Sequence, residues 1–393
     1  MDERTALGLR MSSLLLRGGG PSTVAGIVEW FGAMQAQDMN SGLWSLGCRL
    51  PGHTIQDVNA ALEERTVLRT WPMRGTVHFV PAVDAHWMLE LMGVRALGGA
   101  AKRRETLGLD ERTVDRAVDL LGTALAGGGR MTRAECLATL TDGGIEVTGQ
   151  RGYHLLWYAA QRAVTAIAPH VGKEQTFVLL DDWVPAPRRP GRDEALGIIA
   201  VRYFRSHGPA TRKDFAGWTG LTMTDCKTAI AVAGDTLTAV DVAGVEMILA
   251  ADHAPDASSA TRAGASRAGA SRAGASRAGA SRAVSSRRRA EPAGGGGEWL
   301  ALPGFDEYML GYKDRSLMAT PAQLAAIIPG GNGVFQSTLV RDGRVVATWK
   351  RTLTSKGVTV TVLPLDDVDL AAATRALEPF AAYLGVPLTV KNP

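Results

Sequence analysis

The chain has 393 residues, of which 46% are apolar and 21% are charged, a composition typical of a soluble globular protein and not of a disordered one. Its formal net charge is +4, but residues 261–297 contain eight arginines and one glutamate, a net charge of +7, which leaves −3 for the rest of the chain. The total charge therefore gives no support to nucleic-acid binding by the folded part.

The N-terminal segment begins with acidic residues and has only a short apolar run, so it predicts neither a secretory signal nor a membrane-spanning helix. The three cysteines, Cys48, Cys136 and Cys226, lie far apart and form no CxxC pair. This spacing is typical of buried thiols in a reducing compartment and argues against structural zinc or disulfides. We expect a cytoplasmic protein without membrane contact.

Three blocks in the first 253 residues repeat one pattern, in which a polar turn precedes a short helix, a second helix and a β-type run. The helix starts are predicted at Ser22 or Thr23, at Thr132 and at Thr211, because a hydroxyl side chain after a glycine turn favours a helix N-cap. The β-type runs are TVHFVP (76–81), TFVLL (176–180) and VEMILA (245–250).

Helices followed by a hairpin are typical of a winged helix. We therefore expect an α+β fold with three tandem winged-helix, or helix-turn-helix, modules at residues 1–95, 96–190 and 191–253.

Residues 254–297 form an insertion with four consecutive Arg-Ala-Gly-Ala-Ser repeats. Val284 is its only large apolar residue, so the segment cannot bury enough surface to offset the entropy of ordering, and we expect disorder. Its arginines could contact phosphates non-specifically, but a repeat-expanded spacer without a selected role explains them as well.

Residues 298–393 predict a β-rich region with a small sheet and a terminal helix. Residues 333–352 alternate apolar and polar around Asp342-Gly343, a strong hairpin signal. A further strand is expected at 358–364, and a helix at 368–385 that ends at Gly385.

Several common catalytic motifs are absent, namely GxxxxGK[ST], GxGxxG after a strand, HExxH and GxSxG. His53, His78 and His86 share one block, but their spacing does not make a helix-borne metal pair. We expect no metal and no cofactor.

Three segments stand out together: MQAQD (34–38), RGTVHFV (74–80) and LPGFDEYMLGYKDRS (302–316). With these segments the chain resembles the AlkZ-like DNA glycosylases, a winged-helix family that also includes the YcaQ type. The resemblance covers nearly the whole chain outside the arginine repeat. The QxQ form at 35–37 is similar to that of the AlkZ branch, whereas the YcaQ branch has an aspartate at the second position.

The resemblance implies a C-shaped protein with three winged helices around a cleft for duplex DNA. It implies hydrolysis of the N-glycosidic bond of N7-alkylated purines, and some relatives unhook interstrand crosslinks and protect producers of DNA-alkylating compounds. Gln35 and Gln37 match the catalytic pair, with Gln37 the better candidate for orienting water. The hairpin centred on Asp342-Gly343 resembles an element that enters the cleft near the lesion.

The residue chemistry agrees with this interpretation. An N7-alkylated guanine already carries positive charge, so it leaves without protonation, and two neutral amides are adequate to place water and stabilise charge at C1′. Residues two apart lie about 200° apart on a helix but on one side of an extended segment. Both glutamines can therefore serve one site only if the preceding helix ends near Met34.

Candidate DNA contacts come from three places. Arg74, Thr76 and His78 alternate along a strand, where phosphate or groove contact and a solvated strand face are equally good interpretations. The helix start at Arg212 and Lys213 could bind phosphate or be a structural helix end. The C-terminal candidates are Arg341, Arg344, Lys350 and Arg351.

Residues 302–316 also carry charges at Asp306, Glu307, Lys313, Asp314 and Arg315, for which an internal ion-pair network beside two tyrosines is the favoured interpretation. The alternative is a Schiff base between Lys313 and an abasic sugar.

The competing function is a non-enzymatic winged-helix transcriptional regulator, which would dimerise on a two-fold operator. Three non-identical modules in one chain favour instead a monomer on duplex DNA that contains alkylated purines.

Overall fold

The computed structural model describes residues 1–254 and 297–392, and all that follows concerns these residues. The repeat insertion expected at 254–297 lies outside the described residues, except for Ala254 and Gly297. No helix in the two described ranges has both the length and the apolarity needed to cross a bilayer.

Helix α1 (Glu3–Ser13) begins at Asp2, whose carboxylate accepts a hydrogen bond from the Thr5 N–H. The first block starts at Thr23, which caps α2 through the Gly26 N–H, as the sequence predicts. The block consists of α2 (Val24–Phe31), β1 (Met34–Gln35), α3 (Met39–Gly47), α4 (Ile55–Glu63), β2 (Val67–Met73) and β3 (Thr76–Pro81).

A run of short helices connects the first block to the second: η1 (Ala82–Asp84), α5 (Ala85–Met88), η2 (Leu89–Gly93), α6 (Val94–Gly99) and α7 (Ala101–Thr106). The second block contains the N-cap predicted at Thr132, which forms a capping box with Glu135. Its elements are α8 (Glu111–Leu125), β4 (Arg130–Thr132), α9 (Arg133–Asp142), α10 (Arg151–Gln161), β5 (Thr165–Val171), β6 (Glu174–Leu179) and α11 (Leu180–Trp183).

The third block has the same order of helices and hairpin, and Thr211 caps its second helix in a capping box with Asp214. Its elements are α12 (Arg192–His207), α13 (Arg212–Thr219), α14 (Met223–Ala233), η3 (Gly234–Thr236), β7 (Leu237–Val242), β8 (Val245–Ala250) and η4 (Ala251–His253). The predicted β-type run closes every block as the second strand of an antiparallel hairpin.

The hairpins of the first two blocks are joined into one six-stranded sheet in the order β1-β3-β2-β5-β6-β4. The junction is the antiparallel pairing of β2 with β5, where Arg69 lies opposite Ile167. The β7–β8 hairpin of the third block remains a separate two-stranded sheet. Backbone hydrogen bonds between strands therefore join the first two blocks into one sheet. The sequence does not predict this pairing.

The C-terminal region contains a five-stranded sheet in the order β13-β12-β11-β10-β9. The predicted two-residue turn at Asp342-Gly343 is confirmed, with positive φ at both residues, and so is the αL C-cap at Gly385. Its elements are β9 (Trp299–Leu302), α16 (Glu307–Leu310), α17 (Pro321–Ile327), η5 (Pro329–Gly331), β10 (Ser337–Arg341), β11 (Arg344–Thr354), β12 (Gly357–Pro364), α18 (Leu370–Leu384) and β13 (Leu388–Lys391).

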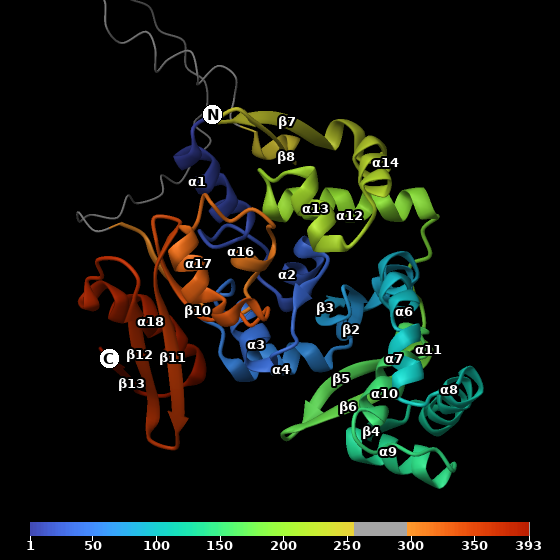
Figure 1. Cartoon of the computed structure of the whole chain (residues 1–393). Helices are drawn as coiled ribbons and strands as arrows, with labels where there is room; N and C mark the ends of the chain where they lie inside the picture. The colour runs from blue at the N-terminus through green and yellow to red at the C-terminus, as the bar shows by residue number, and fades with distance from the viewer. Residues whose placement is uncertain (255–296, 393) are drawn as a thin grey trace, which may run out of the picture.

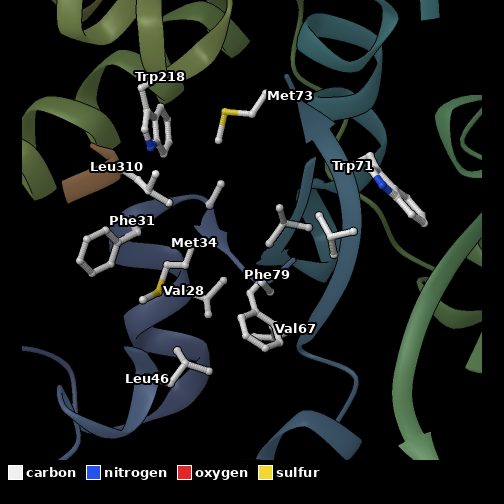
Figure 2. Packing of buried hydrophobic residues seen from close by; sticks show 14 of the residues in the cluster. Val28, Phe31, Met34, Leu46, Val67, Trp71, Met73, Phe79, Trp218 and Leu310 are labelled. Carbon is white, nitrogen blue, oxygen red and sulfur yellow. The ribbon is translucent and has the colours of Figure 1, made fainter. Parts of the chain in front are cut away.

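The first block lies between the C-terminal region on one side and the second and third blocks on the other (Figure 1). Figure 2 shows the packing that joins these parts, in which Phe31 and Met34 lie near Trp218 of the third block and Leu310 of the C-terminal region. All four side chains are at most 8% exposed. Side chains from the first block, the third block and the C-terminal region therefore pack together where the segment after Met34 begins.

Candidate active site

The Gln35-Ala36-Gln37 tripeptide lies in the short connection between α2 and α3. Helix α2 ends at Phe31, and Gly32 follows at φ 79°, a conformation that a residue with a Cβ rarely adopts. The next helix begins after Asp38, whose carboxylate accepts a hydrogen bond from the Ser41 N–H. Helix α2 thus ends before Met34, which is the condition for the two glutamines to share one site; Gln35 lies in strand β1 and Gln37 in the bend that follows it.

Strand β3 fixes the conformation of this connection. Met34 and Gln35 pair with Phe79 and His78 in an antiparallel ladder, and the Ala36 N–H donates to the Val77 oxygen over 2.9 Å. The sequence segments 34–38 and 74–80, which are 36 residues or more apart, are therefore side by side.

Glu307 brings the third segment to the same place. Its Oε1 accepts a hydrogen bond from the Gln35 N–H over 2.9 Å, and its Oε2 accepts one from Trp218 Nε1 over 2.9 Å. His207 Nε2 lies 3.3 Å from Oε2 and is the donor there, because a carboxylate only accepts, while His207 Nδ1 lies 2.8 Å from the Ser206 hydroxyl. A fully buried carboxylate thus holds the backbone of the first glutamine.

Burial raises the pKa of Glu307, but the hydrogen bond and positive charge of His207, the charge that His78 gains below its own pKa of about 4, and the Gln35 N–H outweigh burial and bring it down to about 2. Glu307 is therefore a carboxylate at neutral pH. Three donors, on Gln35, Trp218 and His207, point at this one carboxylate. A buried ion needs such hydrogen bonds to offset the loss of its hydration.

Glu307→Gln is expected to destabilise the protein at neutral pH. An amide has one oxygen and cannot accept from both Gln35 and Trp218, which donate to different oxygens of Glu307, so one buried N–H loses its partner. The expected loss is about 1–3 kcal/mol in the free energy of unfolding.

The same comparison has a pH dependence. Because the pKa of Glu307 is lowered on folding, its contribution is complete above its usual pKa of 4.5 and is lost as the pH falls towards about 2. Urea denaturation of both proteins at neutral pH and near pH 3 measures this difference. A gap of the same size at both pH values would contradict the ionised state of Glu307.

Gln37 is exposed, and its side-chain carbonyl accepts a hydrogen bond from the Val77 N–H over 3.0 Å. This bond continues the ladder that Ala36 begins and fixes which end of the amide is oxygen. Gln37 keeps one carbonyl lone pair and both amide hydrogens for another group.

The Gln35 side chain is only 9% exposed, yet its amide has no hydrogen-bond partner among residues 1–254 and 297–392. Its polar atoms are not among the fully buried ones without a partner, so water or substrate can reach them. Gln35 therefore has its full hydrogen-bonding capacity available beside Gln37.

The strand candidates Arg74, Thr76 and His78 do not share one environment. His78 is fully buried, its Nδ1 lies 2.9 Å from the Thr76 oxygen, and its Nε2 lies 3.3 Å from the Arg74 guanidinium. Burial and the charge of Arg74 lower the pKa of His78 to about 4, so the ring is neutral. Arg74 is exposed and Thr76 is half-buried. Because His78 is buried beneath Arg74 and bonded to it, His78 supports Arg74 and is not part of a solvated face.

The turn at Asp342-Gly343 is packed against the body of the protein. The Tyr308 hydroxyl donates to the Gly343 oxygen, and a Cβ on Gly343 would collide with Leu7. Arg341 donates to the Asp367 oxygen, and Arg344 lies 3.6 Å from Glu3. This turn therefore does not project from the molecule.

The hairpin that projects is the next one, between β11 and β12, which extends at the lower left of Figure 1. Its end is exposed from Thr352 to Lys356, and Leu353 there is 58% exposed. Arg351 of this hairpin is half-buried, and the charge of Asp38 acts on its guanidinium. The β11–β12 hairpin, with Lys350 and Arg351, is thus the one that projects from the molecule.

The remaining sequence candidates are placed as follows. Arg212 and Lys213 are exposed in the first turn of α13. Lys313 has an exposed side chain, while its backbone N–H donates to Asp214 Oδ1 over 2.8 Å.

Among the charges in 302–316, Asp306 and Glu307 find their partners outside that segment, whereas Asp314 and Arg315 bond within it. Asp306 forms a two-point ion pair with Arg49, with distances of 2.8 and 2.9 Å, and both side chains are at most 1% exposed. Arg315 donates to the Met309 oxygen and lies over the Phe335 ring. The network is therefore internal to the protein, but it joins this segment to α3 and the third block instead of closing on itself.

Arg49, His207 and Trp218 are the supporting residues that the sequence does not reveal. Each lies far along the chain from its carboxylate partner, and none belongs to a recognisable motif.

The family model described as DNA glycosylase AlkZ-like matches residues 28–385. An interstrand DNA cross-link repair glycosylase of Streptomyces sahachiroi is 24% identical over 362 residues, which cover 89% of this chain and 87% of that protein. The solved structure of Streptomyces sahachiroi DNA glycosylase AlkZ superposes with a TM-score of 0.76 at 23% identity, with each chain fully covered.

Proposed function

Since this chain belongs to the AlkZ-like DNA glycosylase family, we propose that it hydrolyses the N-glycosidic bond of N7-alkylated purines in duplex DNA. Membership in a family of DNA glycosylases makes it an enzyme that acts on DNA, in place of the alternative of a non-enzymatic regulator. The observation that supports the finer assignment is the pair of neutral amides, Gln35 and Gln37, held on one short connection.

We propose the following chemistry. The C1′–N9 bond breaks, and its electron pair neutralises the positive charge of the alkylated base, so no general acid is needed. The oxygen of a bound water attacks C1′, which carries developing positive charge, and one proton of that water passes to the solvent as the C1′ hydroxyl forms. Amides suffice to hold that water and the sugar because the substrate supplies the leaving-group activation.

The two glutamines share this task. Gln37 donates through its amide hydrogens, because Val77 already occupies one lone pair of its carbonyl. Gln35 supplies a second acceptor, because its amide has no partner among the described residues. In this assignment Gln37 remains the residue that orients the water, and Gln35 assists it.

For DNA binding, we propose that the three helix–hairpin blocks are winged helices arranged in a C around a cleft for the duplex. Its contacts would come from exposed or half-buried cations on different blocks: Arg74, Arg212, Lys213, Lys350 and Arg351. Winged-helix modules and a single catalytic connection suit a monomer, and we place the enzyme in the cytoplasm. Like the relative named as a cross-link repair glycosylase, it would accept crosslinked purines, in repair or in self-resistance.

The experiment is a base-release assay. Purified protein is incubated with a duplex that contains N7-methylguanine, and the free base is identified by mass spectrometry. We expect N7-methylguanine in solution and an abasic site in the strand. If neither N7-methylguanine nor a bulkier N7 adduct is released, the assignment of N7-alkylated purines is wrong.

A further inference from the structure

A pocket of about 170 Å³ opens beside Gln37, between the first and second blocks. Its walls include Arg69 and Trp71 of β2, Arg133 at the start of α9 and Tyr153 of α10. Trp71 projects from β2 away from Phe79, on the side of the strand that faces the second block (Figure 2). The volume corresponds to about five or six water molecules, which is enough for a small polar group.

Arg69 is an unusual residue for such a wall. Its side chain is only 5% exposed, and no carboxylate within the described ranges lies within 4 Å of its guanidinium. Within residues 1–254 and 297–392, its one side-chain hydrogen bond joins Nη2 to His170 Nε2 over 2.7 Å. Arginine stays protonated in proteins, so this is a buried cation without a counter-ion, which is costly unless an anion binds.

The surroundings add positive charge and little negative charge. Arg130 also lies near His170, and burial together with Arg69 and Arg130 lowers the pKa of the His170 ring to about 4. Glu63, the acid beside this cluster, is paired with Arg130 at 3.0 Å. The potential at the pocket therefore favours an anion.

A second observation points to a missing ligand. Trp71, which lines the pocket, has a buried Nε1 without a hydrogen-bond partner among the residues described. Polar groups of this kind gather where a bound group completes the structure.

We propose that this pocket binds one phosphodiester of the damaged strand, next to the lesion, through the Arg69 guanidinium with Arg133 at its entrance. The proposal rests on the proposed function, because Gln37 forms part of the same wall. A planar guanidinium matches two phosphate oxygens at once. The alkylated base itself is a poor occupant, because its positive charge would face Arg69.

Arg69→Met tests the proposal, because methionine keeps most of the side-chain volume and removes the charge. Each protein is titrated with duplexes that carry an abasic-site analogue and one neutral methylphosphonate at successive positions around it. We expect wild type to lose about 10- to 100-fold in affinity at one position, the value of one charge-assisted contact. Arg69→Met should bind the unmodified duplex more weakly than wild type by the same factor. A methylphosphonate at the sensitive position should then cause no further loss of affinity in this variant.

The salt dependence gives a second readout, since Arg69→Met should lower its slope by about one. Arg162→Met, an exposed arginine paired with Asp115, is the matched control and should keep the wild-type profile. Inorganic phosphate alone should not raise the melting temperature of wild type more than that of Arg69→Met.

Two results would overturn the proposal. One is an identical methylphosphonate profile for wild type and Arg69→Met. The other is stabilisation by inorganic phosphate that depends on Arg69 without any position-specific effect in DNA, which would assign the pocket to a free anion. Neither readout requires base release, so a failure of the proposed chemistry would be distinguished from a failure of this site.

Discussion

Gln37→Ala is expected to lower the single-turnover rate of N7-methylguanine release about 100- to 1000-fold, the typical effect of removing one preorganised polar group at a reacting centre. The dissociation constant for the same duplex should change by less than about three-fold, because an amide contributes little to phosphate binding. Alanine removes the donors that hold water and also the acceptor of the Val77 N–H. Thermal unfolding of the variant, measured in parallel, separates the second effect from the first.

Gln35→Ala should have a loss of similar size, and the double variant should be only slightly worse than the more affected single variant, because groups that act on one water are not additive. The matched control is Asp38→Asn, the adjacent carboxylate. Asparagine keeps the cap on the Ser41 N–H, so this variant should retain most of the wild-type rate. Loss of activity in Asp38→Asn with little loss in Gln37→Ala would move the chemistry from amides to a carboxylate.

Asp306→Ala is expected to lower the free energy of unfolding by about 3–5 kcal/mol, because it leaves the buried Arg49 guanidinium without its counter-ion. Asp306 also accepts hydrogen bonds from the Ser45 hydroxyl and the Tyr308 N–H, which add to the loss. Domains are stable by only about 5–15 kcal/mol, so the effect is a large fraction of the total. Equilibrium denaturation in urea measures it.

Two further variants make this result specific. Asp115→Ala, which breaks the exposed pair with Arg162, should cost no more than about 0.5 kcal/mol. Arg49→Met combined with Asp306→Leu should recover part of the stability lost in Asp306→Ala, because no charge remains buried alone. A loss below about 1 kcal/mol for Asp306→Ala would show that the pair does not stabilise the junction.

Local signals explain why much of the fold is predictable from the sequence. The caps at Thr23, Thr132 and Thr211 act within three residues, and the Asp342-Gly343 turn needs only its own two residues. The break in the chain before the glutamine pair follows from one such signal, since Gly32 ends α2 before Gln35, which is the condition for both amides to serve one site.

Pairings between distant residues explain what the sequence does not reveal. Nothing near Glu307 in the chain indicates that it holds the Gln35 N–H, or that His207 and Trp218 complete its shell. The joining of β2 to β5, which places Arg69 beside the second block, is likewise a tertiary event.

The projecting hairpin shows a different limit. The stronger turn signal, at Asp342-Gly343, belongs to a hairpin that is packed against Tyr308 and Leu7, whereas the longer β11–β12 hairpin reaches solvent. Turn chemistry predicts where a hairpin forms, but the length of its strands beyond the sheet decides whether it projects.

The most direct test of the central claim compares N7-methylguanine with hypoxanthine in the same duplex under single-turnover conditions. If two neutral amides suffice because the lesion brings its own positive charge, wild type should release N7-methylguanine and leave the neutral hypoxanthine in place. Efficient release of hypoxanthine would contradict the account, because a neutral purine needs an acid that this pair of glutamines does not provide.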